Sequence, residues 1–345
     1  MVSALGLPSK RELLARSLLW SGVSALIARL PQRSQLLILN YHRIGNAAED
    51  RFDPDLFSAS ADEFDCQIAY LKRHTLLVTL EEAVAFIEGT VCDARPRCRS
   101  LITFDDGYLD NYEVAFPVLR SRGAQGVFFL TTGVLGSNGI PWWDRVAYIV
   151  KATRKRRFAM SHPVSIEVDL DRDGLLPSLR RVSTACYWLN PADTAIFLQA
   201  LAQRTEVDEP SQQVRRYLTW QEAQEMLAGG MAIGSHTNCH PVLGRLTPED
   251  QAVELRTSRE TIKNRLNIAA DVVAYPYGTP SSFSEETQKL AREAGYRAAF
   301  TLRPGSNLQG KIDPYGIKRI AIGGVSRARF QVQTAVCRLA GQYWP

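Results

Sequence analysis

The fold is decided by the stretch LITFDDG, residues 101–107. Its first four residues favour a buried strand, because Ile, Thr and Phe pack well on a pleated sheet. Asp105 and Asp106 follow at once, and Gly107 allows a sharp turn at the strand end. Two neighbouring carboxylates thus lie at a strand C-terminus, where ligand sites gather in parallel α/β folds. A polar turn that caps a helix would also fit this motif when it is taken alone.

Strands and helices are predicted to alternate on both sides of this stretch, which is typical of a largely parallel sheet. The predicted strands are residues 36–44, 76–78, 101–104, 126–130, 231–235, 272–275, 298–301 and 317–320. The predicted helices are residues 61–73, 81–88, 111–122, 219–228, 247–266 and 284–294. Pro117 is expected to bend the third helix or to delay its start.

Residues 133–218 break the alternation, and we interpret them as an insertion beside the sheet. Trp142, Trp143 and Asp144 are candidates for a substrate rim, because sugar rings stack on exposed Trp faces. Trp side chains are more often core or loop anchors, which is the alternative. The basic run at residues 154–157 is most simply a solvated surface, with contact to an anionic lipid or sugar phosphate as the second interpretation.

Composition indicates a globular protein that does not bind nucleic acid. The 345 residues are 45% hydrophobic and 22% charged, and the formal net charge of +5 is mild. No basic stripe is interleaved with aromatic residues. The six cysteines form no CxxC pair, which argues against a zinc ribbon or a thioredoxin-like motif. A reducing compartment is the simpler expectation, and a Cys92–Cys98 disulfide is left open.

The N-terminal residues 1–33 are predicted to contain an amphipathic helix. Its apolar positions recur at roughly helical spacing, at Leu14, Leu18, Val23, Ile27 and Leu30. Charged residues interrupt the apolar run, no signal-peptide cleavage site follows, and the run is too short to span a membrane. We expect the helix to pack on the protein. Peripheral contact of residues 9–30 with the inner membrane is the alternative, and the expected location is cytoplasmic.

Four predicted strands end in polar residues, and three of the five histidines are among them. These ends are Tyr41-His42, Asp105-Asp106, residues 236–240 and residues 276–278. In a parallel barrel all strand C-termini lie on one face, so these groups can converge. Histidines spaced four apart, as at positions 236 and 240, can reach one ion, and one carboxylate would complete a metal site with open positions. Four unrelated polar loops are the competing interpretation.

Three of these segments resemble the motifs of the polysaccharide deacetylases, also called the NodB-homology or carbohydrate esterase family 4 enzymes. TFDDG at 103–107 resembles motif 1, HTNCH at 236–240 matches the H-[ST]-x-x-H pattern of motif 2, and YPYG at 275–278 resembles the end of motif 3. The resemblance implies an α/β fold, a distorted (β/α) barrel of about seven parallel strands. The barrel would span residues 34–345, with the insertion 133–218 after the second motif-bearing strand.

The resemblance also implies a metal-dependent hydrolase that removes N-acetyl groups from an amino-sugar polysaccharide or its lipid-linked precursor, in exopolysaccharide biosynthesis. Asp106, His236 and His240 would hold one divalent ion, with zinc expected first and cobalt or nickel as alternatives. Asp105 would be the general base, and the backbone N–H of Tyr277 would face the developing oxyanion.

Two departures from the family pattern bear on catalysis. The Arg that begins motif 3 is replaced by Ala274, so Arg319 or Arg43 would have to steady the base. No histidine follows His240, although the family usually takes its general acid from a C-terminal histidine. His42 lies in a Tyr-His-Arg context that resembles the branch similar to poly-N-acetylglucosamine deacetylases, so we expect it to be the acid.

Three alternatives stay open at this point. His42 could be a structural residue that bonds a loop carbonyl. The barrel could be a carbohydrate-binding protein with weak catalysis, for which the missing motif 3 Arg is the one argument. The hydrolase could instead act on a non-sugar amide or an O-acetyl ester, because the loops that set specificity show no recognisable pattern.

Overall fold

The computed structural model describes residues 13, 14, 17, 33–91, 95–136, 139–208 and 215–340. The predicted N-terminal helix, its membrane alternative and Cys92 therefore lie almost entirely outside the described residues. Among the described helices, none combines the length and the apolar character needed to cross a bilayer. The cytoplasmic location stays a prediction.

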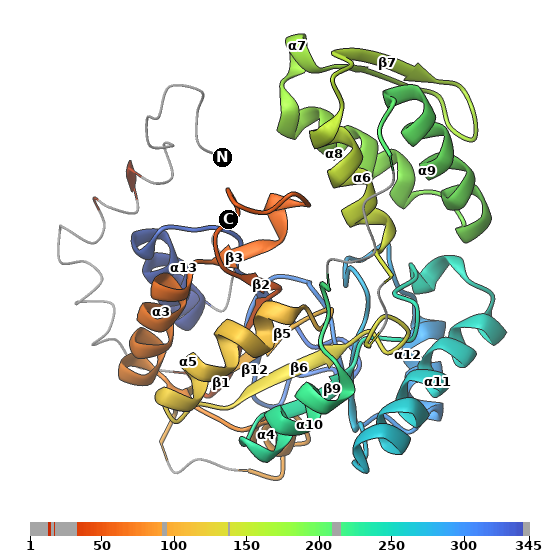
Figure 1. Cartoon of the computed structure of the whole chain (residues 1–345). Helices are drawn as coiled ribbons and strands as arrows, with labels where there is room; N and C mark the ends of the chain where they lie inside the picture. Colours follow the sequence, from red (N-terminus) through yellow and green to blue (C-terminus); the bar gives the residue numbers. More distant parts are fainter. Residues whose placement is uncertain are drawn as a thin grey trace. The chain divides into compact units, whose positions relative to one another are not determined.

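The larger part of the chain is built around a curled sheet whose strands are mostly parallel (Figure 1). The strands follow one another in the order β11-β10-β9-β6-β5-β1-β12, while β13 pairs with β1 and β4 with β5. Their bounds are β1 Gln35–Tyr41, β4 Leu76–Leu77, β5 Cys98–Phe104, β6 Gly126–Leu130, β9 Ala232–Ser235, β10 Val272–Ala274, β11 Ala298–Phe300, β12 Asn307–Leu308 and β13 Ile320–Ala321. A separate pair comprises β2 Arg43–Ile44 and β3 Phe57–Ala59. The predicted α/β class and the distorted barrel of about seven strands are confirmed.

Helices alternate with these strands along the chain. They are α3 Ala61–His74, α4 Leu80–Ile87, α5 Phe116–Ser121, α10 Trp220–Ala228, α11 Pro248–Leu266, α12 Glu285–Glu293 and α13 Arg327–Ala340, with the short turns η2 Asn111–Ala115 and η3 Leu243–Arg245. The helix predicted over 111–122 begins with a π-helical turn, and α5 starts at Phe116 with Pro117 in its first turn. Thr219 caps α10 through the expected reciprocal bonds with Glu222.

The ends of the sheet are joined by the chain around residue 319. Ile317 forms a parallel bridge with Phe300 of β11, whereas Ile320 pairs with Leu39 of β1. Every residue of β1, β5 and β6 is buried, as expected for parallel strands covered on both faces. One segment thus contacts both edges, and its side chains reach the interior of the barrel. β12 was not predicted, and its antiparallel pairing with β1 is compatible with the expected largely parallel sheet.

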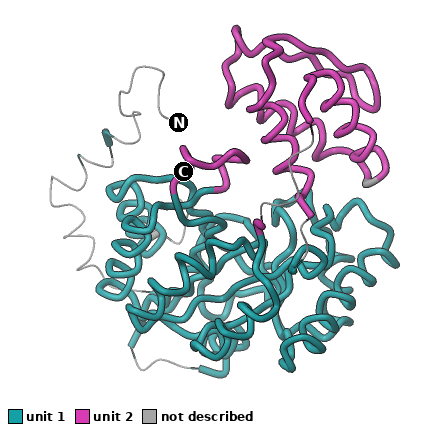
Figure 2. Tube along the Cα trace, viewed as in Figure 1, with its two compact units in different colours: residues 1–45, 57–136, 217–345 teal, residues 46–56, 137–216 magenta. Residues whose placement is uncertain are grey.

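Residues 46–56 and 137–216 form a second compact unit (Figure 2). It contains η1 Pro54–Leu56, α6 Trp142–Ala152, the antiparallel hairpin β7 Arg157–Met160 and β8 Ile166–Asp169, α7 Leu170–Asp173, α8 Leu175–Tyr187 and α9 Pro191–Thr205. The unit has its own core, which includes Phe158, Val182 and Phe197. The segment 46–56 was not predicted to belong here. The Lys151 ammonium group ties it to α6 by donating to the carbonyls of Asp50 and Phe52.

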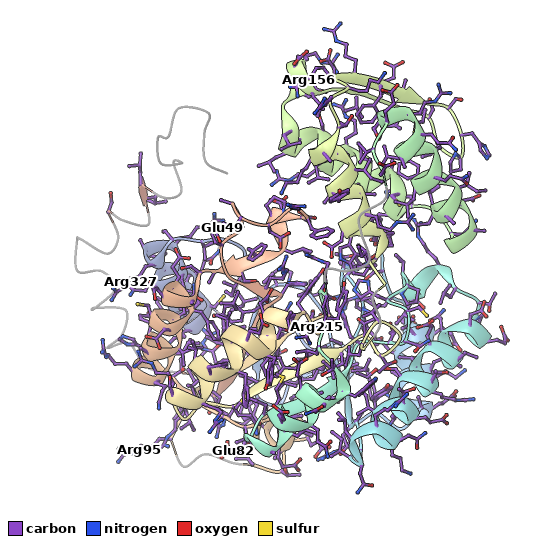
Figure 3. All side chains as sticks on the ribbon, viewed as in Figure 1. Glu49, Glu82, Arg95, Arg156, Arg215 and Arg327 are labelled. Atoms are coloured by element: carbon purple, nitrogen blue, oxygen red, sulfur yellow. The ribbon has the colours of Figure 1, made fainter. Side chains whose placement is uncertain are left out.

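The basic run of this unit is exposed and paired with acidic neighbours. Arg156, labelled in Figure 3, donates to Asp171 at 2.8 Å, and Arg157 lies 2.9 Å from Asp169. Exposed pairs of this kind contribute little to stability, because solvent and salt screen the two charges. This arrangement agrees with the simpler interpretation of the run as a solvated surface.

Candidate metal centre

Asp106, His236 and His240 converge at the C-terminal ends of β5 and β9. One ligand atom from each lies within 4.8 Å of the others, and all three residues are buried. The Nε2 atoms of His236 and His240 lie 3.4 and 3.3 Å from the same oxygen, Oδ1 of Asp106. The structure therefore brings together the three side chains that the sequence motifs single out.

Backbone geometry and hydrogen bonding aim these groups at one point. Asp106 and His240 adopt left-handed conformations, with φ of 75° and 59°, which non-glycine residues rarely do. The Nδ1–H of His236 donates to the carbonyl of Ala274 at 2.8 Å, so the other ring nitrogen faces Asp106. A backbone acceptor on one ring nitrogen is how many metal-binding histidines are oriented.

These three residues fit a divalent cation. Two imidazoles and one carboxylate suit zinc, cobalt or nickel, and the 3.3–3.4 Å separations are longer than good hydrogen bonds. Burial raises the pKa of Asp106, but the contacts from both imidazoles outweigh it and hold that pKa well below the usual value. Burial lowers the pKa of His240, whereas at His236 the effect of burial is outweighed by Asp105 and Asp106, which raise the pKa. Metals bind carboxylates and neutral imidazoles, so a bound cation would displace any proton on His236.

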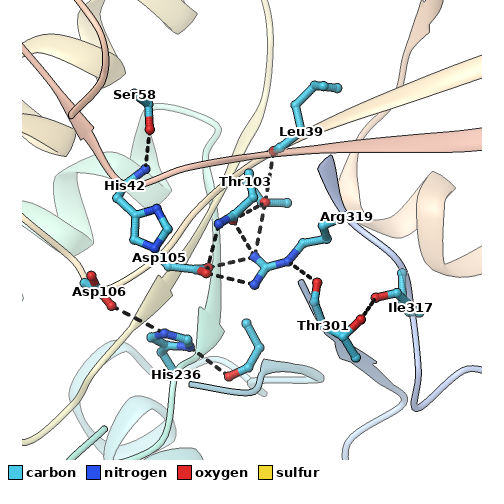
Figure 4. A network of polar contacts seen from close by, with 12 residues as sticks. Leu39, His42, Ser58, Thr103, Asp105, Asp106, His236, Thr301, Ile317 and Arg319 are labelled. Carbon is cyan, nitrogen blue, oxygen red and sulfur yellow. Dashed lines mark hydrogen bonds and ion pairs between the residues drawn. The ribbon is translucent and has the colours of Figure 1, made fainter. Parts of the chain in front are cut away.

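Asp105 is held by a buried ion pair with Arg319 (Figure 4). The two terminal guanidinium nitrogens donate to its two oxygens at 2.7 and 2.8 Å, and the Asn40 amide donates to Oδ2 at 3.1 Å. The Arg319 Nε donates to the carbonyl of Thr301, which completes its support. Burial raises the pKa of Asp105, but Arg319 and the nearby imidazoles together lower it below the usual value. Asp105 is therefore an oriented carboxylate beside the three candidate ligands.

The two arginines named from the sequence have different partners. Arg319 makes the direct ion pair with Asp105, whereas Arg43 pairs with Asp110 at 2.8 Å and lies over the ring of Phe57. The sequence did not reveal Asn40. A lone amide inside the apolar run of β1 is the one signal that marks it.

The His42 ring lies next to Asp105, on the side of Asp105 where Asp106 also lies (Figure 4). Of the causes that lower the pKa of Asp105 and Asp106, His42 is the smallest. Its backbone is held on both sides, because its N–H donates to the Ser58 hydroxyl at 3.0 Å and its carbonyl accepts from the Asn111 amide at 2.8 Å. The structure thus brings His42 to the same strand-end face as the candidate ligands.

The remaining predicted residues lie in two places. The Tyr277 ring contacts the His240 ring, with centroids 4.8 Å apart, and Tyr277 has a φ of 62°. In the second unit, Trp142 and Trp143 are half-buried. Asp144 is fully buried and binds Arg216 at 2.8 Å, so it is an internal partner and not an exposed rim residue. A rim role for the two Trp residues stays a prediction.

A model of the polysaccharide deacetylase family matches residues 94–163 and 193–299, about half of the chain. The chain belongs to the polysaccharide deacetylase family. Proteins of this family are deacetylating hydrolases that act on N-acetylated glycans, and this chain is accordingly a hydrolase of that class. It is 24% identical over 302 residues to the Bacillus subtilis protein YxkH, which is provisionally named a polysaccharide deacetylase. That match covers 86% of this chain and 75% of YxkH.

Solved structures of deacetylases share the fold. The deacetylase PplD from Streptococcus pyogenes, in complex with acetate, is 19% identical, with a TM-score of 0.55 over 88% of this chain and 99% of that one. IcaB from Ammonifex degensii is 22% identical, with a TM-score of 0.55 over 89% and 98%. A de-N-acetylase from Aggregatibacter actinomycetemcomitans is 15% identical, with a TM-score of 0.53 over 86% and 99%. At these identities the likeness establishes the fold alone, and the predicted family is confirmed by the family-model match.

Proposed function

We propose that this polysaccharide deacetylase removes N-acetyl groups from an amino-sugar polymer or its lipid-linked precursor with the help of one divalent metal ion. The proposal depends on one observation: the side chains of Asp106, His236 and His240 are buried and converge on one point. Next to them lies Asp105, in its ion pair with Arg319. When bound, a cation there would polarise the acetyl carbonyl and make a water molecule more acidic. Zinc is the first candidate, and cobalt and nickel suit the same ligands.

Within this proposal the two adjacent aspartates have separate tasks. Asp106 binds the cation, and Asp105 accepts the proton of the attacking water as the new C–O bond forms. Arg319 and Asn40 support this role, because they fix the orientation of the Asp105 carboxylate. Arg319, in the segment just before β13, would then take the role that the motif 3 Arg has in other family members.

The amide bond breaks when the tetrahedral intermediate collapses, and the leaving amine needs a proton. His42 would donate it, since its ring lies close to both aspartates. The backbone N–H of Tyr277, in the loop after β10, would donate to the oxyanion. The products are acetate and a free amino sugar.

Two lines of support favour an N-acetylated sugar over the alternatives. One protein with the same fold is a de-N-acetylase, which supports cleavage of an amide and not of an O-acetyl ester. A purely glycan-binding barrel has no need of a carboxylate held by a buried arginine beside a metal site. The proposed exopolysaccharide setting rests on the resemblance of Tyr41-His42-Arg43 to the poly-N-acetylglucosamine deacetylase branch.

The test is acetate release from N-acetylglucosamine oligomers by the purified chain. A chelator should abolish release, and added zinc or cobalt should restore it. Asp106→Asn is the matched variant and should not be restored, because one ligand is missing. Release that continues unchanged in chelator would reject the metal-dependent mechanism. If the enzyme hydrolyses a generic acetyl ester but not the oligomers, its substrate is an O-acetyl ester and not an N-acetylated sugar.

A further inference from the structure

Glu254 on α11 is bonded to the loop that connects the two candidate metal-binding histidines. Its Oε2 atom accepts the backbone N–H of Asn238 at 2.9 Å and that of Cys239 at 2.8 Å. Successive N–H groups that converge on one anion form a recognised anion-binding arrangement of the backbone. Here the anion is a carboxylate of the chain itself, supplied by a helix that follows the loop.

The loop needs outside support because its conformation is costly. Thr237 and His240 are non-glycine residues with φ of 63° and 59°, a region that persists only where the surroundings impose it. Within the loop, the His240 N–H donates to the Thr237 hydroxyl at 3.1 Å. This bond closes the turn, but it does not anchor the turn to the rest of the fold.

The middle of the loop is anchored from two segments, the chain after β6 and Glu254 of α11. After β6, the Thr132 N–H donates to the carbonyl of Thr237 at 3.2 Å, and its hydroxyl donates to the side-chain oxygen of Asn238 at 3.0 Å. The N–H of Gly133, after β6, donates to the carbonyl of Asn238 at 2.8 Å, and a Cβ at Gly133 would lie 2.7 Å from that oxygen. Glu254 binds the neighbouring N–H groups. The Cys239 side chain also makes a hydrogen bond with Glu254.

We propose that Glu254 is a positioning residue for the metal centre: it fixes the backbone between His236 and His240 and thereby sets the separation of their Nε2 atoms. The inference deepens the proposed function and rests on its metal site. His236 lies at the end of β9 and is oriented by Ala274, so it has a rigid support of its own. His240 depends on the loop, and Glu254 supplies its charged anchor.

Amide hydrogen exchange in the metal-free protein tests the anchor directly. The N–H groups of Asn238 and Cys239 should be protected in the wild-type chain. Glu254→Ala should remove that protection, while Glu254→Gln should keep much of it because the amide oxygen still accepts. Glu260→Ala, an exposed change on the same helix, is the matched control and should have no effect.

Metal affinity tests the consequence. Zinc competition with a chelator should show about 10- to 100-fold weaker binding for Glu254→Ala, the usual effect of losing a group that orients a ligand. Glu254→Gln should lie much closer to the wild type. The visible absorption of the cobalt-loaded protein should change in Glu254→Ala, because the position of His240 at the ion changes. A purely structural role would lower stability without changing this spectrum.

Several outcomes would overturn the inference. Unchanged exchange at both amides, or zinc affinity and a cobalt spectrum equal to wild type in Glu254→Ala, would do so while leaving the metal centre intact. A wild-type chain that takes up neither zinc nor cobalt would overturn the metal centre and the inference together. If Glu254→Ala does not fold, Glu254→Asp makes the same comparison, because its shorter side chain withdraws the carboxylate from the loop.

Discussion

Replacing Arg319 by methionine is expected to leave the Asp105 carboxylate as an unpaired charge inside the barrel. The two side chains are 0% and 2% exposed and share two short bonds, so water cannot take the place of the guanidinium. Removing one partner of such a pair costs about 3–5 kcal/mol. Since whole domains are stable by about 5–15 kcal/mol, this loss is large enough to measure without ambiguity.

The assay is urea unfolding of the metal-free protein, so that ion binding does not contribute. A double-mutant cycle isolates the pair: Asp105→Asn combined with Arg319→Met removes both charges and should recover much of the stability that Arg319→Met loses. Arg297→Met is the surface control, because Arg297 pairs with Glu88 in an exposed position and should cost less than about 1 kcal/mol.

Loss of the Arg319–Asp105 ion pair should also lower catalytic activity. With the guanidinium gone, Asp105 loses both its orientation and the charge that opposes the effect of burial on its pKa. We expect kcat to fall by about 100-fold or more, the usual contribution of a general base. A loss of stability below about 1 kcal/mol, or a double variant no more stable than Arg319→Met, would refute the reasoning.

Three further changes test other parts of the structure. His42→Ala should keep zinc affinity but lose most turnover, and near-wild-type turnover in a steady-state assay would reject its role as the acid. Asn111→Ala removes the amide that donates to the His42 carbonyl. We expect kcat to fall by up to about 100-fold while zinc affinity stays unchanged. If kcat and zinc affinity fall together, the change has disrupted the whole site and Asn111 does not act through His42. Asp144→Ala should lower stability by about 3 kcal/mol in thermal or urea unfolding, because it removes the buried carboxylate that Arg216 contacts at 2.8 Å, whereas the Asp50 carboxylate lies farther away, at 3.6 Å. An unaffected midpoint would contradict this.

Local sequence was sufficient where function depends on short motifs at strand ends. Asp105 and Asp106 follow a buried strand, and His236 and His240 are four residues apart, so their roles could be proposed without knowing any long-range contact. Parallel strands place all their C-terminal ends on one face, and this rule alone predicted that the motifs converge. The prediction that Asp144 is a rim residue failed because it depended on burial, which a short motif does not reveal. A Trp-Trp-Asp run has no local signal that separates an exposed carboxylate from a buried one.

Only the tertiary structure decided which residues support the motifs. Arg319 reaches Asp105 because the chain around it joins both edges of the curled sheet, and Glu254 reaches the histidine loop from the next helix. Arg319 and Arg43 were equal candidates in the sequence, since an arginine's long side chain can pair with many carboxylates and its choice depends on distances set by strand pairing. Short sequence motifs were enough to name the candidate reacting groups and their order along the chain. Burial and long-range pairing, which are properties of the folded chain alone, decided what holds those groups in place.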